Sequence, residues 1–205
     1  MFDDRTGSVW SHLDGRALGG ELAGEALQVL PLQTTTWAAW VADHPDTTVL
    51  ALDTGYRYRN SVNLAGGGLG RTFADSLDGI DDRLPVNELV IGVLVGRQAA
   101  AFPVDVIREE VPLHTAVDDV PLVILADTEG EPSLAYHRAL TDGRVLDFKR
   151  SEDGTLRDAQ TDSRWTSSGL ATSGELAGVQ LTFVTSFLSE WYGWAAFHPD
   201  TTIEG

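Results

Sequence analysis

The residues best suited to chemistry are two His-Pro-Asp triplets, which lie 154 positions apart in the chain. An imidazole and a carboxylate two residues away are ligands that divalent transition metals accept. If the two triplets met across an internal twofold axis, they would form one metal site. The candidate ligands are His44, Asp46, His198 and Asp200. No other cofactor is predicted.

The same two segments also have a purely structural interpretation. Each histidine ends a W-x-x-W-x-x-x-H pattern, and residues three and four apart share one face of an α-helix. The large apolar area of tryptophan favours the core, so each histidine would only satisfy backbone groups nearby. We take packing as the prediction for these helices and keep the metal site as the alternative.

A second group of acidic residues, in and near an expected turn, could bind a hard cation such as calcium through oxygen ligands. These residues are Asp118, Asp119 and Asp127. Solvated turn residues are the simpler interpretation. The sequence contains no cysteine and no G-x-S-x-G or H-x-x-x-H pattern, so the common hydrolase and zinc signatures are not found.

The chain repeats itself. Residues 37–48 recur as residues 191–202, and residues 20–24 recur as residues 174–178. A D-x-x-T-x-S-x-W element precedes both copies. Self-similarity at a fixed shift is the signature of a duplicated structural unit. The tryptophans shared by the two units are Trp10, Trp37 and Trp40 in the first, and Trp165, Trp191 and Trp194 in the second.

Both tryptophan segments are predicted to be short helices that stop at their histidine, because the proline that follows disfavours helical backbone before it. Thr35 or Thr36 is expected to cap the first helix and Ser189 the second. After the first helix, residues 49–52 predict a strand.

Short apolar runs separated by turn signals predict a mainly β (α+β) fold of two tandem units, each ending in a tryptophan helix. The domains are expected at residues 1–52 (the C-terminal half of the first unit), 53–83 (a linker) and 84–205 (the complete second unit). The strands expected in the second unit are 88–95, 99–102, 113–117, 120–126, 134–137 and 145–148, with a helix at 104–110.

The first unit is predicted to be incomplete. The second unit has strands from residue 82 before its D-x-x-T-x-S-x-W element, whereas the first has only Met1 and Phe2 ahead of it. Exposed strand edges attract other strands. We therefore expect a missing N-terminal segment, or self-association, to cover the open edge of the first unit.

The charge restricts the partners. A net charge of -17 and a pI near 4.4 argue against nucleic acid and against anionic membrane surfaces. Lys149 is the only lysine among 14 basic residues, which is typical of proteins adapted to high salt. We expect a halophilic source, with an ordinary acidic protein as the alternative. The chain shows no export signal and no apolar run that would span a membrane.

Several motifs together resemble the domain of unknown function 3179 family, and the resemblance covers essentially the whole chain. They are the DRTGSVW segment at residues 4–10, the G-x-L-x-G element, the W-x-x-W-x-x-x-H-P-D-T element and the opening DRLP at residues 82–85. The resemblance implies a prokaryotic protein, here haloarchaeal, that is exported or lipid-anchored and has no established activity. The polar signature of the family's front segment is not kept at residues 114–128.

These observations favour a non-catalytic, extracytoplasmic binding or interaction module. The alternative is a metal-dependent or acid/base enzyme whose site lies partly in the missing N-terminal segment.

Overall fold

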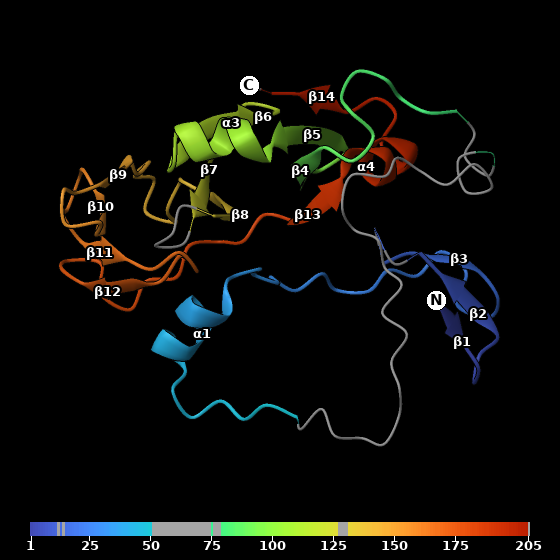
Figure 1. Ribbon diagram of the computed structural model, residues 1–205, viewed down its shortest axis with the longest axis horizontal. Helices are drawn as coiled ribbons and strands as arrows, with labels where there is room; N and C mark the ends of the chain where they lie inside the picture. Colours follow the sequence, from blue (N-terminus) through green and yellow to red (C-terminus); the bar gives the residue numbers. More distant parts are fainter. Residues whose placement is uncertain (12, 14, 51–74, 76–78, 127–130, 205) are drawn as a thin grey trace.

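The computed structural model describes residues 1–205 except 12, 14, 51–74, 76–78, 127–130 and 205. The described residues form four antiparallel or mixed sheets and three short helices (Figure 1). The expected mainly β composition is confirmed.

The N-terminal sheet is small and antiparallel. It contains β1 (Phe2–Asp3), β2 (Ser8–Trp10) and β3 (Ala17–Gly19) in the order β1-β2-β3. The first helix, α1 (Trp37–Asp43), follows after a stretch with no further strand.

The central sheet joins two distant parts of the chain. β4 (Leu89–Val95) and β5 (Gln98–Pro103) form a hairpin, because an apolar, β-branched run ends at a Gly-Arg turn. β13 (Ser186–Glu190) pairs with the free edge of β4, and β14 (Thr202–Ile203) pairs in parallel with β5. The sheet order is therefore β13-β4-β5-β14.

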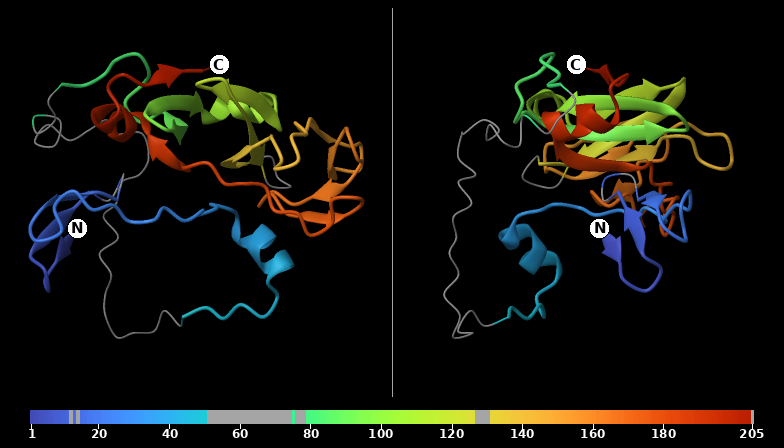
Figure 2. Two further views of the ribbon diagram at one scale, coloured as in Figure 1. Left: turned by 180° about the vertical axis from the view of Figure 1, so that it is seen from behind. Right: turned by 90° about the vertical axis from the view of Figure 1, so that its right-hand side faces the viewer.

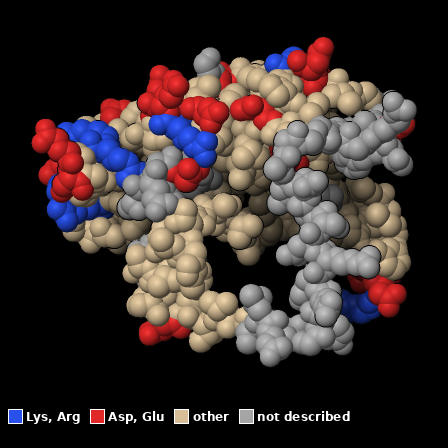
Figure 3. Space-filling model, viewed as in Figure 1, with Lys and Arg blue, Asp and Glu red and all other residues tan. Residues whose placement is uncertain are grey.

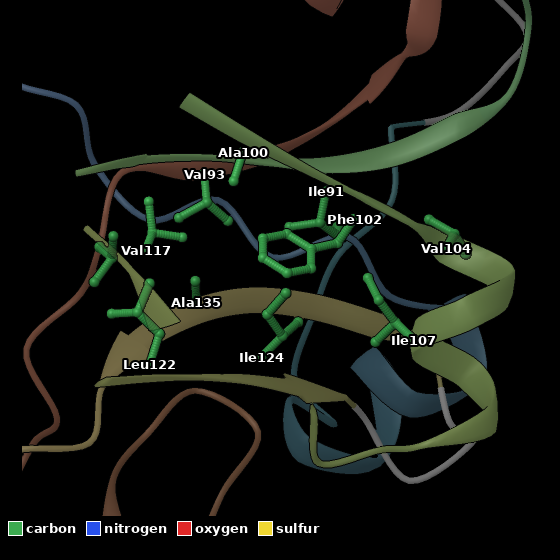
Figure 4. Packing of buried hydrophobic residues seen from close by; sticks show 11 residues of the cluster. Ile91, Val93, Ala100, Phe102, Val104, Ile107, Val117, Leu122, Ile124 and Ala135 are labelled. Carbon is green, nitrogen blue, oxygen red and sulfur yellow. The ribbon is translucent and has the colours of Figure 1, made fainter. Parts of the chain in front are cut away.

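A helix or a second sheet covers each face of the central sheet. α4 (Trp191–Phe197) packs on one face, and alternate residues of β4 and β5 point toward it. The other face packs against α3 (Val104–Glu109) and against the three-stranded sheet β6-β7-β8 (Figure 4). The core on this side includes Ile91, Val93, Phe102, Ile107, Leu122 and Ile124.

The three-stranded sheet consists of β6 (Leu113–Val117), β7 (Val120–Ala126) and β8 (Pro132–His137). Asp118 and Asp119 form the turn between β6 and β7, with φ of 52° and 61°. Positive φ at both central residues is the pattern of a type I′ hairpin turn, which aspartate tolerates. This turn accounts for the two adjacent aspartates; Asp127 lies outside the described residues.

The last sheet is built from β9 (Phe148–Arg150), β10 (Leu156–Asp158), β11 (Arg164–Trp165) and β12 (Ala171–Ser173) in the order β12-β11-β10-β9. It encloses a second core that shares residues with β7 and β8.

Two strand predictions were wrong. Residues 145–148 were expected to form one strand, but Val145 makes only an isolated bridge with Ala139, and the strand that starts at Phe148 pairs with β10. The turn near residue 143 closes on its own short bridge, and Phe148 is buried in the second core instead. Residues 49 and 50 form no strand, and the rest of that expected strand lies outside the described residues. Most of the predicted linker, residues 53–83, also lies outside them.

Candidate interaction site at the first tryptophan helix

The ends of α1 are set by its own residues. The Thr36 side chain accepts a hydrogen bond of 3.2 Å from the backbone N–H of Ala39, as an N-cap residue does. The backbone N–H of His44 donates to the carbonyl of Trp40 over 2.8 Å, and Pro45 follows. Trp40 Nε1 donates to Thr47 Oγ1 over 2.9 Å, which ties the helix to the turn after it.

The second copy of the sequence has nearly the same local geometry. Trp194 Nε1 donates to Thr201 Oγ1, also over 2.9 Å. The residue before each helix has extended backbone, and His44 and His198 have φ of -131° and -129° with ψ of 67°. The His44 ring lies 4.1 Å from the Trp40 ring, and the His198 ring lies 4.3 Å from the Trp194 ring. The sequence of each segment therefore specifies its local conformation.

The two helices differ in how they begin. The expected Ser189 cap is wrong: Glu190 precedes α4 without a side-chain cap, and Ser189 Oγ donates to the carbonyl of Glu190. The first N–H groups of α4 instead donate to backbone carbonyls ahead of β4. Trp191 N–H donates to Glu88 O over 2.7 Å, and Tyr192 N–H donates to Val86 O over 3.1 Å.

The two helices also differ in burial. Trp191 and Trp194 are 0% exposed, whereas Trp37 is 58% exposed and Trp40 is 43% exposed. The Trp194 ring lies directly over Gly92 of β4, where a β-carbon would overlap it. In Figures 1 and 2, α4 lies on the central sheet, while α1 lies apart from it with no described strand packed over it.

A shallow, wide-open hollow of about 550 Å³ lies beside α1. We call it the α1 groove; it is lined by Leu32, Gln33, Thr34, Thr35, Thr36, Trp37 and Trp40. In the view of Figure 3, the surface over α1 is mostly uncharged, with acidic side chains at its lower edge. An uncharged hollow with two exposed tryptophans is typical of an interaction surface.

One side of the segment that lines the groove is fixed to the body of the molecule. Gln33 Nε2 donates to Ser167 Oγ over 2.9 Å. Residues 34–36 share a second, smaller cavity of about 230 Å³ with Leu89 and Leu188. The side of residues 32–36 that faces the α1 groove is open to solvent.

Comparison with known proteins gives a family but no activity. A family profile described as "Protein of unknown function (DUF3179)" matches residues 1–201. The chain belongs to this family. Searches of curated proteins and of solved structures returned no match. In the part of this DUF3179 chain that the structure describes, no helix is long and apolar enough to cross a membrane.

The structure does not bring the two His-Pro-Asp triplets together. His44 and His198 end α1 and α4, which lie apart in Figures 1 and 2. Asp46 and Asp200 are exposed. Among the described residues, no cluster of three or more histidine, aspartate or glutamate side chains has the geometry of a metal site.

One backbone carbonyl in the second triplet and one just after it bind an arginine. Arg83 donates to the carbonyls of Thr201 and Pro199, and it pairs with Asp81 through two nitrogens. The guanidinium lies 5.3 Å from the Trp191 ring, within range of a cation–π contact. The Arg83 hydrogen bond holds the pKa of Asp81 below its ordinary value. The arginine of the DRLP segment therefore links the chain before β4 to the turn after α4.

Trp165 belongs to a buried polar network rather than to a ligand site. Its Nε1 donates to Asp158 Oδ2 over 2.9 Å, and Thr161 and Ser163 also donate to this fully buried carboxylate. The first D-x-x-T-x-S-x-W element has matching contacts, because Thr6 Oγ1 donates to Asp3 Oδ2. The Thr6 hydrogen bond is the main reason that the pKa of Asp3 lies below its ordinary value.

The sequence analysis did not predict one polar cluster. His114 Nε2 accepts a hydrogen bond of 2.9 Å from Phe148 N–H, and Arg138 pairs with Asp147 at 2.9 Å. Gln160 holds the other oxygen of Asp147. Partial burial, and then Arg138, lower the pKa of His114, while Asp147 acts in the opposite direction. The cluster joins the β6-β7-β8 sheet to the β9 sheet. Its members are spread over 46 positions, so no local motif reveals it.

Proposed function

We propose that this DUF3179 chain is a non-catalytic, extracytoplasmic interaction module that binds a protein partner at the α1 groove. The observation that carries the proposal is the different burial of two helices that share the W-x-x-W-x-x-x-H motif. The tryptophans of α4 form a core, whereas those of α1 are exposed beside an open groove. Exposed tryptophans on an otherwise acidic surface are suited to be the central residues of an interface.

The proposal includes a duplication: two tandem β-rich units, of which residues 1–52 are part of the first and residues 84–205 are the second. The sequence matches support it. So do the equal tryptophan-to-threonine hydrogen bonds, the nearly equal backbone angles at His44 and His198, and the two threonine-to-aspartate hydrogen bonds. The extracytoplasmic location is carried by the family resemblance alone.

Paired substitutions test whether the α1 tryptophans contribute to the stability of the fold. Truncating a buried tryptophan to alanine usually costs about 3–5 kcal/mol, whereas exposed positions change stability by about 0.5 kcal/mol or less. We expect Trp37→Ala to stay near the lower figure and Trp191→Ala to reach the higher one in urea unfolding. Equal losses for the two variants would show that α1 is core, and the proposed binding surface would then be withdrawn.

The alternative, a metal-dependent or acid/base enzyme, stays a prediction. Metal analysis of the purified protein tests it: stoichiometric metal that is lost in both His44→Ala and His198→Ala would favour the enzyme.

A further inference from the structure

The second copy of the repeat contains a location equivalent to the α1 groove, and in that copy the location is occupied by a strand. Residues 32–36 correspond, 154 positions later, to β13, and Trp37 and Trp40 correspond to Trp191 and Trp194. The strand in that location is β4, which pairs with β13 along one edge. Trp194 of α4 packs on the face of β4, over Gly92. The arrangement of β4 against β13 and α4 is therefore a template for the kind of segment that would fit the α1 groove.

The template fixes the direction and the register of a strand that would fill the α1 groove. β13 and β4 are antiparallel, with Leu188 opposite Ile91 and Glu190 opposite Leu89. The positions that correspond to Leu188 and Glu190 are Thr34 and Thr36. An incoming strand would run antiparallel to residues 32–36 and add one strand along them.

The template also fixes the shape of the strand's face. Trp194 occupies the space above Gly92, and Val90 and Leu94 flank that glycine on the same face of β4. Because the Trp40 indole is held by Thr47 as Trp194 is held by Thr201, it needs the same gap. The partner strand must carry glycine opposite Trp40, with aliphatic residues two positions away on each side.

Backbone donors at the start of α1 support the same assignment. In α4, the first two N–H groups donate to carbonyls of the segment just before β4. Among the described residues, no acceptor is hydrogen-bonded to the N–H groups of Trp37 and Ala38. A strand in the groove would bring two carbonyls to these donors.

A second, folded copy of this chain cannot supply its own β4. Both edges of β4 are already paired, with β13 and with β5, and its face is covered by Trp194. We propose that the α1 groove binds a β-hairpin of a separate polypeptide by strand addition, and that this hairpin has the apolar pattern and the central glycine of β4–β5. The inference rests on the proposed function and names its partner.

Disulfide trapping tests the register, and it is unambiguous here because the chain has no cysteine. The probe is a synthetic peptide of residues 82–103 that carries Ile91→Cys and a solubilising tail. The protein variants are Thr34→Cys, in the template register; Thr35→Cys, one residue out of register; and Val49→Cys, exposed and outside the groove.

We expect Thr34→Cys to cross-link at least about tenfold faster than either control, because a one-residue shift points the side chain to the other face. The same peptide with Gly92→Val should lose this preference. Equal rates for all three variants, or an undiminished rate with Gly92→Val, would overturn the inference.

A fused version covers the case of weak binding. Placing the peptide sequence ahead of Met1 through a Gly-Ser linker raises its effective concentration into the ~mM range. Cross-linking should then become complete for Thr34→Cys only. If the fused forms also show no selective cross-linking while Trp37→Ala keeps its stability, the hairpin partner is ruled out and the proposed binding surface is retained. If Trp37→Ala unfolds the chain, the proposed function fails first.

Discussion

Adding a single methyl group at Gly92 tests how α4 is held on the central sheet. A β-carbon at this position would overlap ring carbons of Trp194. The ring is fully buried, its Nε1 is bonded to Thr201, and the Phe187 ring lies 5.4 Å away, so it has no room to move aside. Overpacking a core usually costs about 1–3 kcal/mol. We expect Gly92→Ala to cost about 3 kcal/mol, at the upper end of that range.

The assay is thermal and urea unfolding followed by circular dichroism. For a chain of this size, each kcal/mol lowers the Tm by about 2–4 °C, so the expected loss is about 6–12 °C. Gly19→Ala on β3 is the matched control, because a β-carbon there meets no atom within 4 Å. Its Tm should stay within about 2 °C of the parent chain.

A double-substitution cycle identifies the cause. In a Trp194→Leu background, the ring that the methyl group would overlap is absent, so Gly92→Ala should cost less than about 1 kcal/mol. If Gly92→Ala is as harmless as Gly19→Ala in the parent chain, Trp194 does not sit over Gly92. The template for the α1 groove would then be lost as well.

Three further predictions concern the rest of the chain. Because the pKa of His114 is lowered in the folded state, its stabilising contribution is present above the ordinary histidine value of 6.5 and is lost as the pH falls through the folded pKa. His114→Gln should therefore flatten the loss of urea stability between about pH 7 and about pH 5; an unchanged pH profile would contradict this. Asp158→Ala leaves the donors of Thr161 and Trp165 without their acceptor, so it should destabilise the chain by at least about 2 kcal/mol. Asp162→Asn is the surface control, because asparagine also tolerates the positive φ of this position, and it should cost much less. The net charge of -17 predicts unfolding in low salt and recovery in molar salt, since salt screens self-repulsion; a Tm that is indifferent to salt would refute the halophilic interpretation.

The elements that the sequence predicted well depend on neighbouring residues. The apolar run at residues 89–95 with its Gly-Arg turn, and the Asp118-Asp119 turn, are specified within a few positions. The capping of α1 by Thr36 is equally local. Patterns of this kind require no knowledge of the rest of the chain.

The features that the sequence did not predict depend on distant residues. The start of α4 is fixed by carbonyls about 100 positions earlier, which is why the expected Ser189 cap is not used. Phe148 pairs with β10 because its side chain enters the second core, not because of its own turn.

Burial of the tryptophans is the clearest case. Trp40 and Trp194 have the same local motif, equivalent threonine partners and the same backbone geometry at the histidine that follows the helix. One is 43% exposed and the other 0%. The difference arises only from whether a strand lies over the helix, so no local sequence pattern could distinguish a core residue from a binding residue here.

The most direct test of the central claim is solvent exposure of the six tryptophans, measured one by one. Fluorine NMR of the 5-fluorotryptophan protein, assigned by single substitutions, reports each indole through its H₂O/D₂O isotope shift. On the monomeric chain, we predict a large shift for Trp37 and Trp40 and none for Trp191 and Trp194. Equal shielding of all four would contradict the account, because α1 would then have no open face for a partner.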